Sequence, residues 1–197
     1  KCLMNDLQAE TGLIKWAENA SLGYCPQDTS AEFESELNLF DWMTQWRDES
    51  HDDQIVRATL GRLLFSSEDF KKSVNVCSGG EKNRLLLAKL FQQPANLIVM
   101  DEPTAALTPR EVDGLLQVVN ELRTQGIGII YISHRLDEID AIADRVTVLR
   151  DGSHVATRDK TDLARDEMIE LMVGRSLEKE FPPHDCQPGP VRLAVKN

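Results

Sequence analysis

Short apolar segments alternate with amphipathic helical segments through the middle of this chain, and this alternation constrains the fold more than any other feature. Leu97–Met100 is a continuous apolar run of strand length, and Ile127–Ile132 is a second. Between and after them lie Val112–Gln125 and Leu136–Ala143, where apolar residues recur at helical spacing. Strands that are buried on both faces and alternate with helices form crossover units. We therefore expect an α/β fold with a mostly parallel sheet.

Two carboxylates and a histidine stand just downstream of these apolar runs. Asp101 and Glu102 follow the first run, and His134 comes shortly after the second. Ligand chemistry in parallel sheets lies at the carboxyl ends of the strands. One carboxylate there can hold magnesium while the next polarises an attacking water. Taken alone, the pair is equally typical of an acidic turn closed by Pro103, and a lone histidine is more often structural.

The segment Ser78-Gly79-Gly80-Glu81 is a second candidate site. It opens a strongly apolar helical stretch that runs to Gln93 and is stopped by Pro94. Amides and the dipole at a helix start favour an anion, and glycines let a phosphate approach closely. The alternative is an ordinary serine cap without a ligand.

The upstream third of the chain carries weaker patterns. Leu13–Trp16 and Ser21–Tyr24 are predicted as short strands. Gln27 follows the second of them, where its side chain could reach a metal or a water. Ala31–Asn75 is acidic with apolar residues near helical spacing, which predicts a helical region. Its aromatic residues are expected in the core.

Further patterns lie downstream of the alternating region. Asp151-Gly152-Ser153 predicts the turn of an antiparallel hairpin. Thr161–Val173 predicts a last helix that ends at Gly174 in the left-handed conformation. Phe181–Pro190 is rich in proline and is expected to be a linker, after which Val191–Val195 resembles the first strand of another domain.

Composition excludes several classes of function. The net charge of −11 and the pI near 4.8 argue against broad binding to DNA or to anionic lipid. The four cysteines are scattered without the close spacing of a zinc site or a redox dithiol, as in a cytosolic protein with reduced thiols. No apolar run approaches the roughly 20 residues that span a bilayer, so any membrane role is expected to come through a partner.

Taken together, the Ser-Gly-Gly-Glu helix start, the Asp-Glu strand end and the strand-Ser-His element resemble the ATP-binding cassette (ABC) ATPases over essentially the whole chain. The resemblance implies a P-loop NTPase-type sheet with a helical subdomain at about residues 31–93, inside a partial ABC domain at residues 1–175. Residues 176–190 are then a linker, and residues 191–197 begin a following domain. ATP and Mg²⁺ are the implied ligands.

The resemblance also implies individual roles. Gln27 corresponds to the glutamine-loop residue, with catalytic and metal contacts, and Asp101 to the magnesium-side aspartate. Glu102 corresponds to the catalytic glutamate and His134 to the switch histidine. Cys77–Glu81 corresponds to the signature motif, in which Ser78, Gly79, Gly80 and Glu81 bind nucleotide and Cys77 replaces the usual leucine. Thr108 stands where a neighbouring loop usually ends in aspartate.

The phosphate-cradling loop of this superfamily is missing from the sequence. That loop needs glycine, four residues and then Gly-Lys-Ser/Thr, because backbone amides and a lysine neutralise the phosphates. No glycine in the chain is followed by lysine. We expect an N-terminally truncated domain that is inactive as an isolated chain. In the family, two cassettes pair head to tail, and each signature motif caps the ATP held by the other's loop.

The two parts of the chain resemble different branches of the family. Up to about Pro103, phrases such as Asp41-Trp42-Met43 are similar to the ribosome-acting ABC-F proteins. From Thr104 onward, Ala105–Glu111 and Ile132–Glu138 are similar to tandem-cassette ATPases of carbohydrate importers. The two resemblances join within Met100–Thr104.

Three hypotheses about function follow. The chain powers carbohydrate import with a second cassette and a membrane permease, in the cytoplasm at the inner face of the membrane. Alternatively, it is a ribosome-bound translation factor, or a non-catalytic hybrid fragment.

Overall fold

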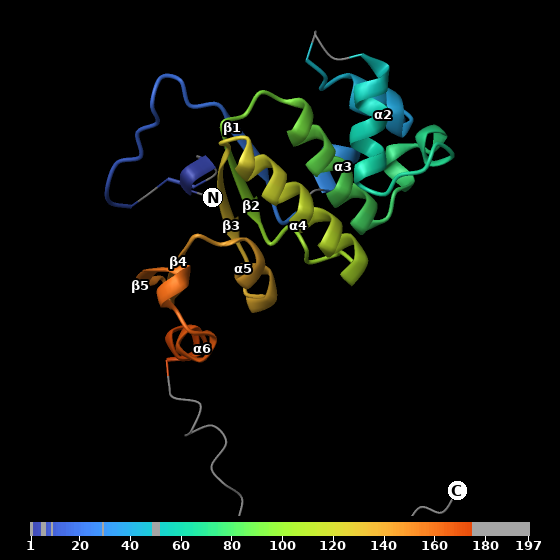
Figure 1. Ribbon diagram of the computed structural model, residues 1–197. Coiled ribbons are helices and arrows are strands. Elements are labelled where there is room, and N and C mark those ends of the chain that lie inside the picture. Colours follow the sequence, from blue (N-terminus) through green and yellow to red (C-terminus); the bar gives the residue numbers. More distant parts are fainter. Residues whose placement is uncertain (1, 5–6, 9, 29, 49–51, 175–197) are drawn as a thin grey trace, which may run out of the picture. The chain divides into compact units, whose positions relative to one another are not determined.

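The computed structural model describes residues 2–4, 7–8, 10–28, 30–48 and 52–174, and the chain divides into two compact units, Lys1–Ile142 and Ala143–Asn197 (Figure 1). The α-helices are α1 (Leu39–Thr44), α2 (Asp53–Arg62), α3 (Gly79–Gln92), α4 (Pro109–Thr124), α5 (Leu136–Ile142) and α6 (Arg165–Val173). The strands are β1 (Leu22–Cys25), β2 (Leu97–Asp101), β3 (Gly128–Ile132), β4 (Arg145–Arg150) and β5 (Ser153–Asp159). Among the described residues, no helix is both long enough and apolar enough to cross a membrane.

The first unit contains a parallel sheet in the order β1-β2-β3 (Figure 1), which confirms the predicted α/β class. In the central strand, the successive residues Ile98, Val99 and Met100 are all buried, as expected for a strand that is covered on both faces. The predicted strand at Leu13–Trp16 is wrong. Leu13 is 88% exposed, so this segment has no buried face that would hold it in a sheet.

The predicted helical region consists of short helices rather than a continuous one. Asn38 and Asp52 have extended backbones, and their side chains accept hydrogen bonds from the first turns of α1 and α2. Each cap therefore starts a new helix. Three 3₁₀ segments complete the region, at Ser30–Phe33, Asp69–Lys71 and Val74–Val76. The aromatic residues belong to its core as predicted, with the rings of Phe33 and Trp42 centred 4.9 Å apart.

Helix α4 covers the sheet with one apolar face. Leu115 and Val119 lie in the same buried cluster as Ile98 and Met100 of β2. The helix starts at Pro109, three residues before the predicted start, because proline fits the first helical position.

The second unit is a hairpin followed by a helix. Strands β4 and β5 pair antiparallel, as predicted, and the turn residues Asp151 and Gly152 both have positive φ. Helix α6 begins at Arg165 rather than Thr161, and Gly174 ends it with φ at 84°, which confirms the predicted stop. The predicted linker and following strand lie outside the described residues.

Replacing Leu115 by alanine tests this packing. The side chain is 1% exposed, so its loss leaves a cavity between α4 and the sheet. We expect the free energy of unfolding, measured by urea titration of tryptophan fluorescence, to fall by about 2–5 kcal/mol. Leu13→Ala makes the same change at an exposed position and is expected to stay within about 0.5 kcal/mol of the parent chain. Equal losses in the two variants would show that α4 does not bury Leu115 in this way.

Candidate functional site

The carboxyl ends of β2 and β3 form the first part of the candidate site. Asp101 pairs with Ile132 in the parallel register, and the amide of Glu102 donates to the carbonyl of Ile132 at 2.9 Å. Glu102 has φ at 48°, in the left-handed region that residues other than glycine seldom adopt. Such backbone strain costs on the order of 1–3 kcal/mol and is concentrated at functional sites. The fold therefore holds Glu102 in a conformation that turns the chain sharply at the sheet edge.

His134 and Glu102 are brought into contact there. The Nδ1 atom of His134 lies 2.8 Å from Oε1 of Glu102, although 32 residues separate them in sequence. An ionised carboxylate only accepts hydrogen bonds, so the shared proton belongs to Nδ1. The Glu102 side chain is 18% exposed and that of His134 is 75% exposed. The histidine thus covers the glutamate from the solvent side, and its Nε2 atom is open to a further ligand.

Asp101 and Gln27 lie at the same edge of the sheet. Strand β1 ends two residues before Gln27, which is exposed, and runs parallel to β2. Burial and, to a smaller extent, the negative charge of Asp101 together raise the pKa of the Cys25 thiol to about 12, which places that carboxylate beside the end of β1. The structure gives no direct contact between Gln27 and Asp101 or Glu102.

These donors fit Mg²⁺ held jointly with a substrate. Carboxylate and amide oxygens are hard ligands, and Mg²⁺ usually takes only one or two carboxylates together with substrate phosphates. Within the described ranges, no cluster of three or more His, Cys, Asp or Glu side chains could hold a metal by itself. Asp101 and Gln27, at the same edge of the sheet, are therefore suited to a shared ion rather than to an all-protein cage.

The start of α3 forms the second part of the site. Ser78 caps the helix: its Oγ accepts from the amide of Glu81 at 3.3 Å, and its own amide donates to the Glu81 carboxylate at 2.7 Å. This capping box leaves the amides of Gly79 and Gly80 without a hydrogen-bond partner among the described residues. The serine cap and the predicted anion site are consequently compatible, because the cap uses neither glycine amide.

Glu81 is held by Lys72, a residue that the sequence patterns did not single out. The Nζ atom of Lys72 lies 2.7 and 2.9 Å from the two carboxylate oxygens. Burial raises the pKa of the Glu81 carboxyl, but the hydrogen bonds from Lys72 and Ser78 outweigh it and hold this pKa below its usual range. Because this carboxylate is occupied inside the chain, Glu81 shapes the helix start, whereas the glycine amides are open to a ligand.

A neighbouring loop packs against the same helix start. A Cβ atom at Gly80 would lie 2.9 Å from the carbonyl oxygen of Ala106, closer than real Cβ atoms come. Only glycine allows this approach. Thr108, at the end of the loop, donates through its amide and its hydroxyl to the carboxylate of Glu111, and so caps α4.

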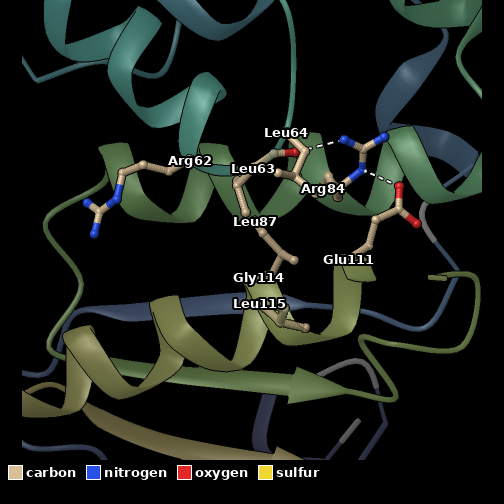
Figure 2. Close-up of a pocket in the computed structure, with 8 residues that line it drawn as sticks. All are labelled: Arg62, Leu63, Leu64, Arg84, Leu87, Glu111, Gly114 and Leu115. Carbon is tan, nitrogen blue, oxygen red and sulfur yellow. Dashed lines mark hydrogen bonds and ion pairs between the residues drawn. The ribbon is translucent and has the colours of Figure 1, made fainter. Parts of the chain in front are cut away.

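Arg84 joins α2, α3 and α4 behind this loop (Figure 2). It donates to the carbonyl of Leu63 at 2.7 Å and forms an ion pair with Glu111 at 3.0 Å. The shallow surface site in Figure 2 lies between these helices and is lined by none of the predicted site residues. The Ser-x-x-Glu spacing at Ser78 and the Thr-x-x-Glu spacing at Thr108 are sequence signals for the two helix caps. No sequence signal pointed to Lys72 or Arg84.

The site residues thus fall into two groups within the first unit. The structure brings Glu102 and His134 together beside Asp101, and it joins Ser78–Glu81 to the loop that follows Pro103 through the contact of Gly80 with Ala106. The same loop also reaches the first group, because the amide of Ala105 donates to the carbonyl of Glu102 at 3.1 Å.

The chain is similar to known proteins in sequence and in fold. The family model described as ABC transporter matches residues 1–105. The chain is 46% identical over 146 residues to the "Probable ATP-binding protein YbiT" of Escherichia coli O157:H7, which covers 74% of the chain and 27% of that protein. It is 48% identical over 140 residues to the "Ribose import ATP-binding protein RbsA" of Shouchella clausii (strain KSM-K16), which covers 71% of the chain and 27% of that protein. The chain therefore spans only about a quarter of the length of these relatives.

Solved structures with low sequence identity share the fold. A metal-chelate type ABC transporter in an inward-facing conformation matches with a TM-score of 0.69 at 21% identity, over 87% of this chain and 71% of that one. A dimeric ATP-binding cassette in a post-hydrolysis state, bound to ADP and Pi, matches with a TM-score of 0.60 at 15% identity, over 71% of this chain and 63% of that one.

Replacing Glu81 by glutamine tests the helix start. A carboxyl with a lowered pKa in the folded state stabilises the fold above its unfolded pKa, and this contribution is lost as the pH falls through the folded pKa. We expect Glu81→Gln to cost about 1 kcal/mol at pH 7, with the difference from the parent chain shrinking below about pH 4. Urea titrations from pH 3 to 8 measure both. Glu18→Gln, at an exposed position, is the control, and a difference from the parent that does not change with pH would contradict the assignment.

Proposed function

This chain belongs to the ABC transporter family, and on that premise we propose that it is part of a nucleotide-hydrolysing subunit that powers carbohydrate import. The observation that carries the proposal is the contact between His134 and Glu102 at 2.8 Å at the carboxyl ends of β2 and β3. Phosphoryl transfer to water depends on positioning and charge stabilisation rather than on covalent chemistry by the protein. A carboxylate held by a second polar group is suited to orient that water.

In this proposal the edge of the sheet carries the hydrolytic residues. Glu102 accepts a hydrogen bond from the attacking water, and His134 fixes the carboxylate through Nδ1 while its Nε2 atom faces the terminal phosphate. Asp101 and Gln27 would hold Mg²⁺. When bound, this ion neutralises phosphate oxygens. Since the 197 residues contain no Gly-Lys pair, the loop that cradles the phosphates comes from outside them.

The start of α3 serves a second cassette. Family geometry pairs cassettes head to tail, so Ser78, Gly79 and Gly80 face the nucleotide that the partner's phosphate loop holds. The two free glycine amides and the helix dipole favour a phosphate there. Glu81, paired with Lys72, keeps the cap in place.

The similarity to a ribose import protein supports carbohydrate as the transported class. The residues from Thr104 onward, with their resemblance to carbohydrate importers, support it as well. Transport then requires a membrane permease, which places the subunit in the cytoplasm at the inner face of the membrane.

A polypeptide of these 197 residues is expected to show no magnesium-dependent ATP turnover above that of its Glu102→Gln variant, because charge neutralisation of the phosphates is missing. Phosphate release measured on the purified chain tests this. In the assembled subunit, Glu102→Gln is expected to lower kcat by roughly 10²–10⁴-fold. A robust rate from the 197-residue chain that disappears in Glu102→Gln would refute the inference that hydrolysis needs a phosphate-binding loop from outside these residues.

Affinity purification from cells distinguishes the transport role from the ribosomal one. The tagged full-length protein is expected to co-purify with a permease from detergent-solubilised membranes, and not to sediment with ribosomes in a sucrose gradient. Sedimentation with ribosomes, together with no recovery of a permease, would favour the translation-factor hypothesis instead.

A further inference from the structure

A buried carboxylate on α5 lies directly behind the loop that carries His134. Glu138 is 2% exposed, and its Oε2 atom accepts hydrogen bonds from the hydroxyl of Tyr131 at 2.9 Å and from Oγ of Ser133 at 3.0 Å. Its Oε1 atom lies 2.9 Å from Nη1 of Arg135, in an ion pair. The side-chain partners described for this carboxylate therefore all come from residues 131–135.

These contacts hold the residues on both sides of the histidine in the chain. The Oγ atom of Ser133, besides donating to Glu138, accepts from the amide of Arg135 at 3.0 Å. Both chain neighbours of His134 are thus tied to one carboxylate and to each other. His134, which lies between these two residues in the chain, in turn contacts Glu102.

Stability alone does not account for a carboxylate at this place. Removing a charge from water is costly, and an apolar residue of similar volume often stabilises a protein as well as a buried ion pair does. Burial raises the pKa of the Tyr131 phenol, and the hydrogen bond to Glu138 raises it further, so the hydroxyl stays protonated and can donate. The carboxylate therefore organises the polar loop around it.

We infer that Glu138 is a positioning residue, which fixes the loop Ser133–Arg135 so that Nδ1 of His134 donates to Glu102. The importance of this contact for hydrolysis rests on the proposed function, but the contact itself can be tested without nucleotide. The hydrogen bonds made by an imidazole decide which of its nitrogens carries the proton. Loss of the Glu102 contact frees the neutral ring to adopt the Nε2–H form, which is the major form of a free imidazole side chain in water.

Long-range ¹H–¹⁵N NMR of the neutral ring reports this tautomer in the 197-residue chain. The His134 signals are assigned by their loss in His134→Asn, because the chain contains four histidines. Glu138→Leu removes all three interactions while filling the space, and Ser133→Ala removes only the hydroxyl. We expect mainly Nδ1–H in the parent chain and mainly Nε2–H in both variants. Glu138→Gln keeps one carbonyl acceptor and is expected to give an intermediate population.

The exposed carboxylate Asp113 provides the control, since Asp113→Asn removes the same charge from α4 and is expected to keep the parent tautomer. If Glu138→Leu does not fold, Ser133→Ala alone decides. A parent chain already in the Nε2–H form, or variants with an unchanged tautomer, would overturn the inference. The NMR measurement needs no nucleotide, so it can be interpreted even if the ATPase or permease experiments contradict the proposed function. Conversely, an unexpected tautomer would overturn the role of Glu138 without deciding the proposed function.

Discussion

The parallel pairing of β2 with β3 is the constraint on which the rest of the candidate site depends. It sets Asp101 opposite Ile132, and the amide of Glu102 then extends the pairing by one more hydrogen bond to the Ile132 carbonyl. Ile98, Val99 and Met100 of β2 are buried, so this strand cannot shift its register by one residue without moving its apolar side chains to other surroundings. The contact between His134 and Glu102 follows from this register, because each residue lies within two positions of its own strand end.

The start of α3 shows how one short segment serves both stability and binding. The capping box satisfies the amides of Ser78 and Glu81, and Lys72 neutralises the glutamate that closes it. Two glycine amides remain at the positive end of the helix, packed so closely against the neighbouring loop that a methyl group at Gly80 would meet the carbonyl oxygen of Ala106. The amides of Gly79 and Gly80 are thus donors of the kind that a phosphate requires.

Sequence reasoning recovered the elements with strong periodicity and failed where structure depends on partners distant in the chain. Strands β2 and β3, α3, α4, the hairpin and the glycine stop at Gly174 follow from apolar runs and turn residues, and the structure confirms them, although β3 is only partly buried. Leu13–Trp16 resembles a strand locally, but no face of it is buried. The sequence placed Glu102 and His134 at one edge, yet their direct contact depends on the backbone conformation of Glu102. Lys72 and Glu138 escaped notice because single charged residues have no periodic signal. The importance of Lys72 comes from its ion pair with Glu81, and that of Glu138 comes from its burial.

All residues assigned to chemistry or to positioning, from Gln27 to Glu138, lie in the first of the two compact units. The hairpin and α6 contribute none of them. Every distance on which the assignment of the candidate site depends therefore joins two residues of the first unit. Substitutions confined to the hairpin or to α6 thus replace no residue of the candidate site.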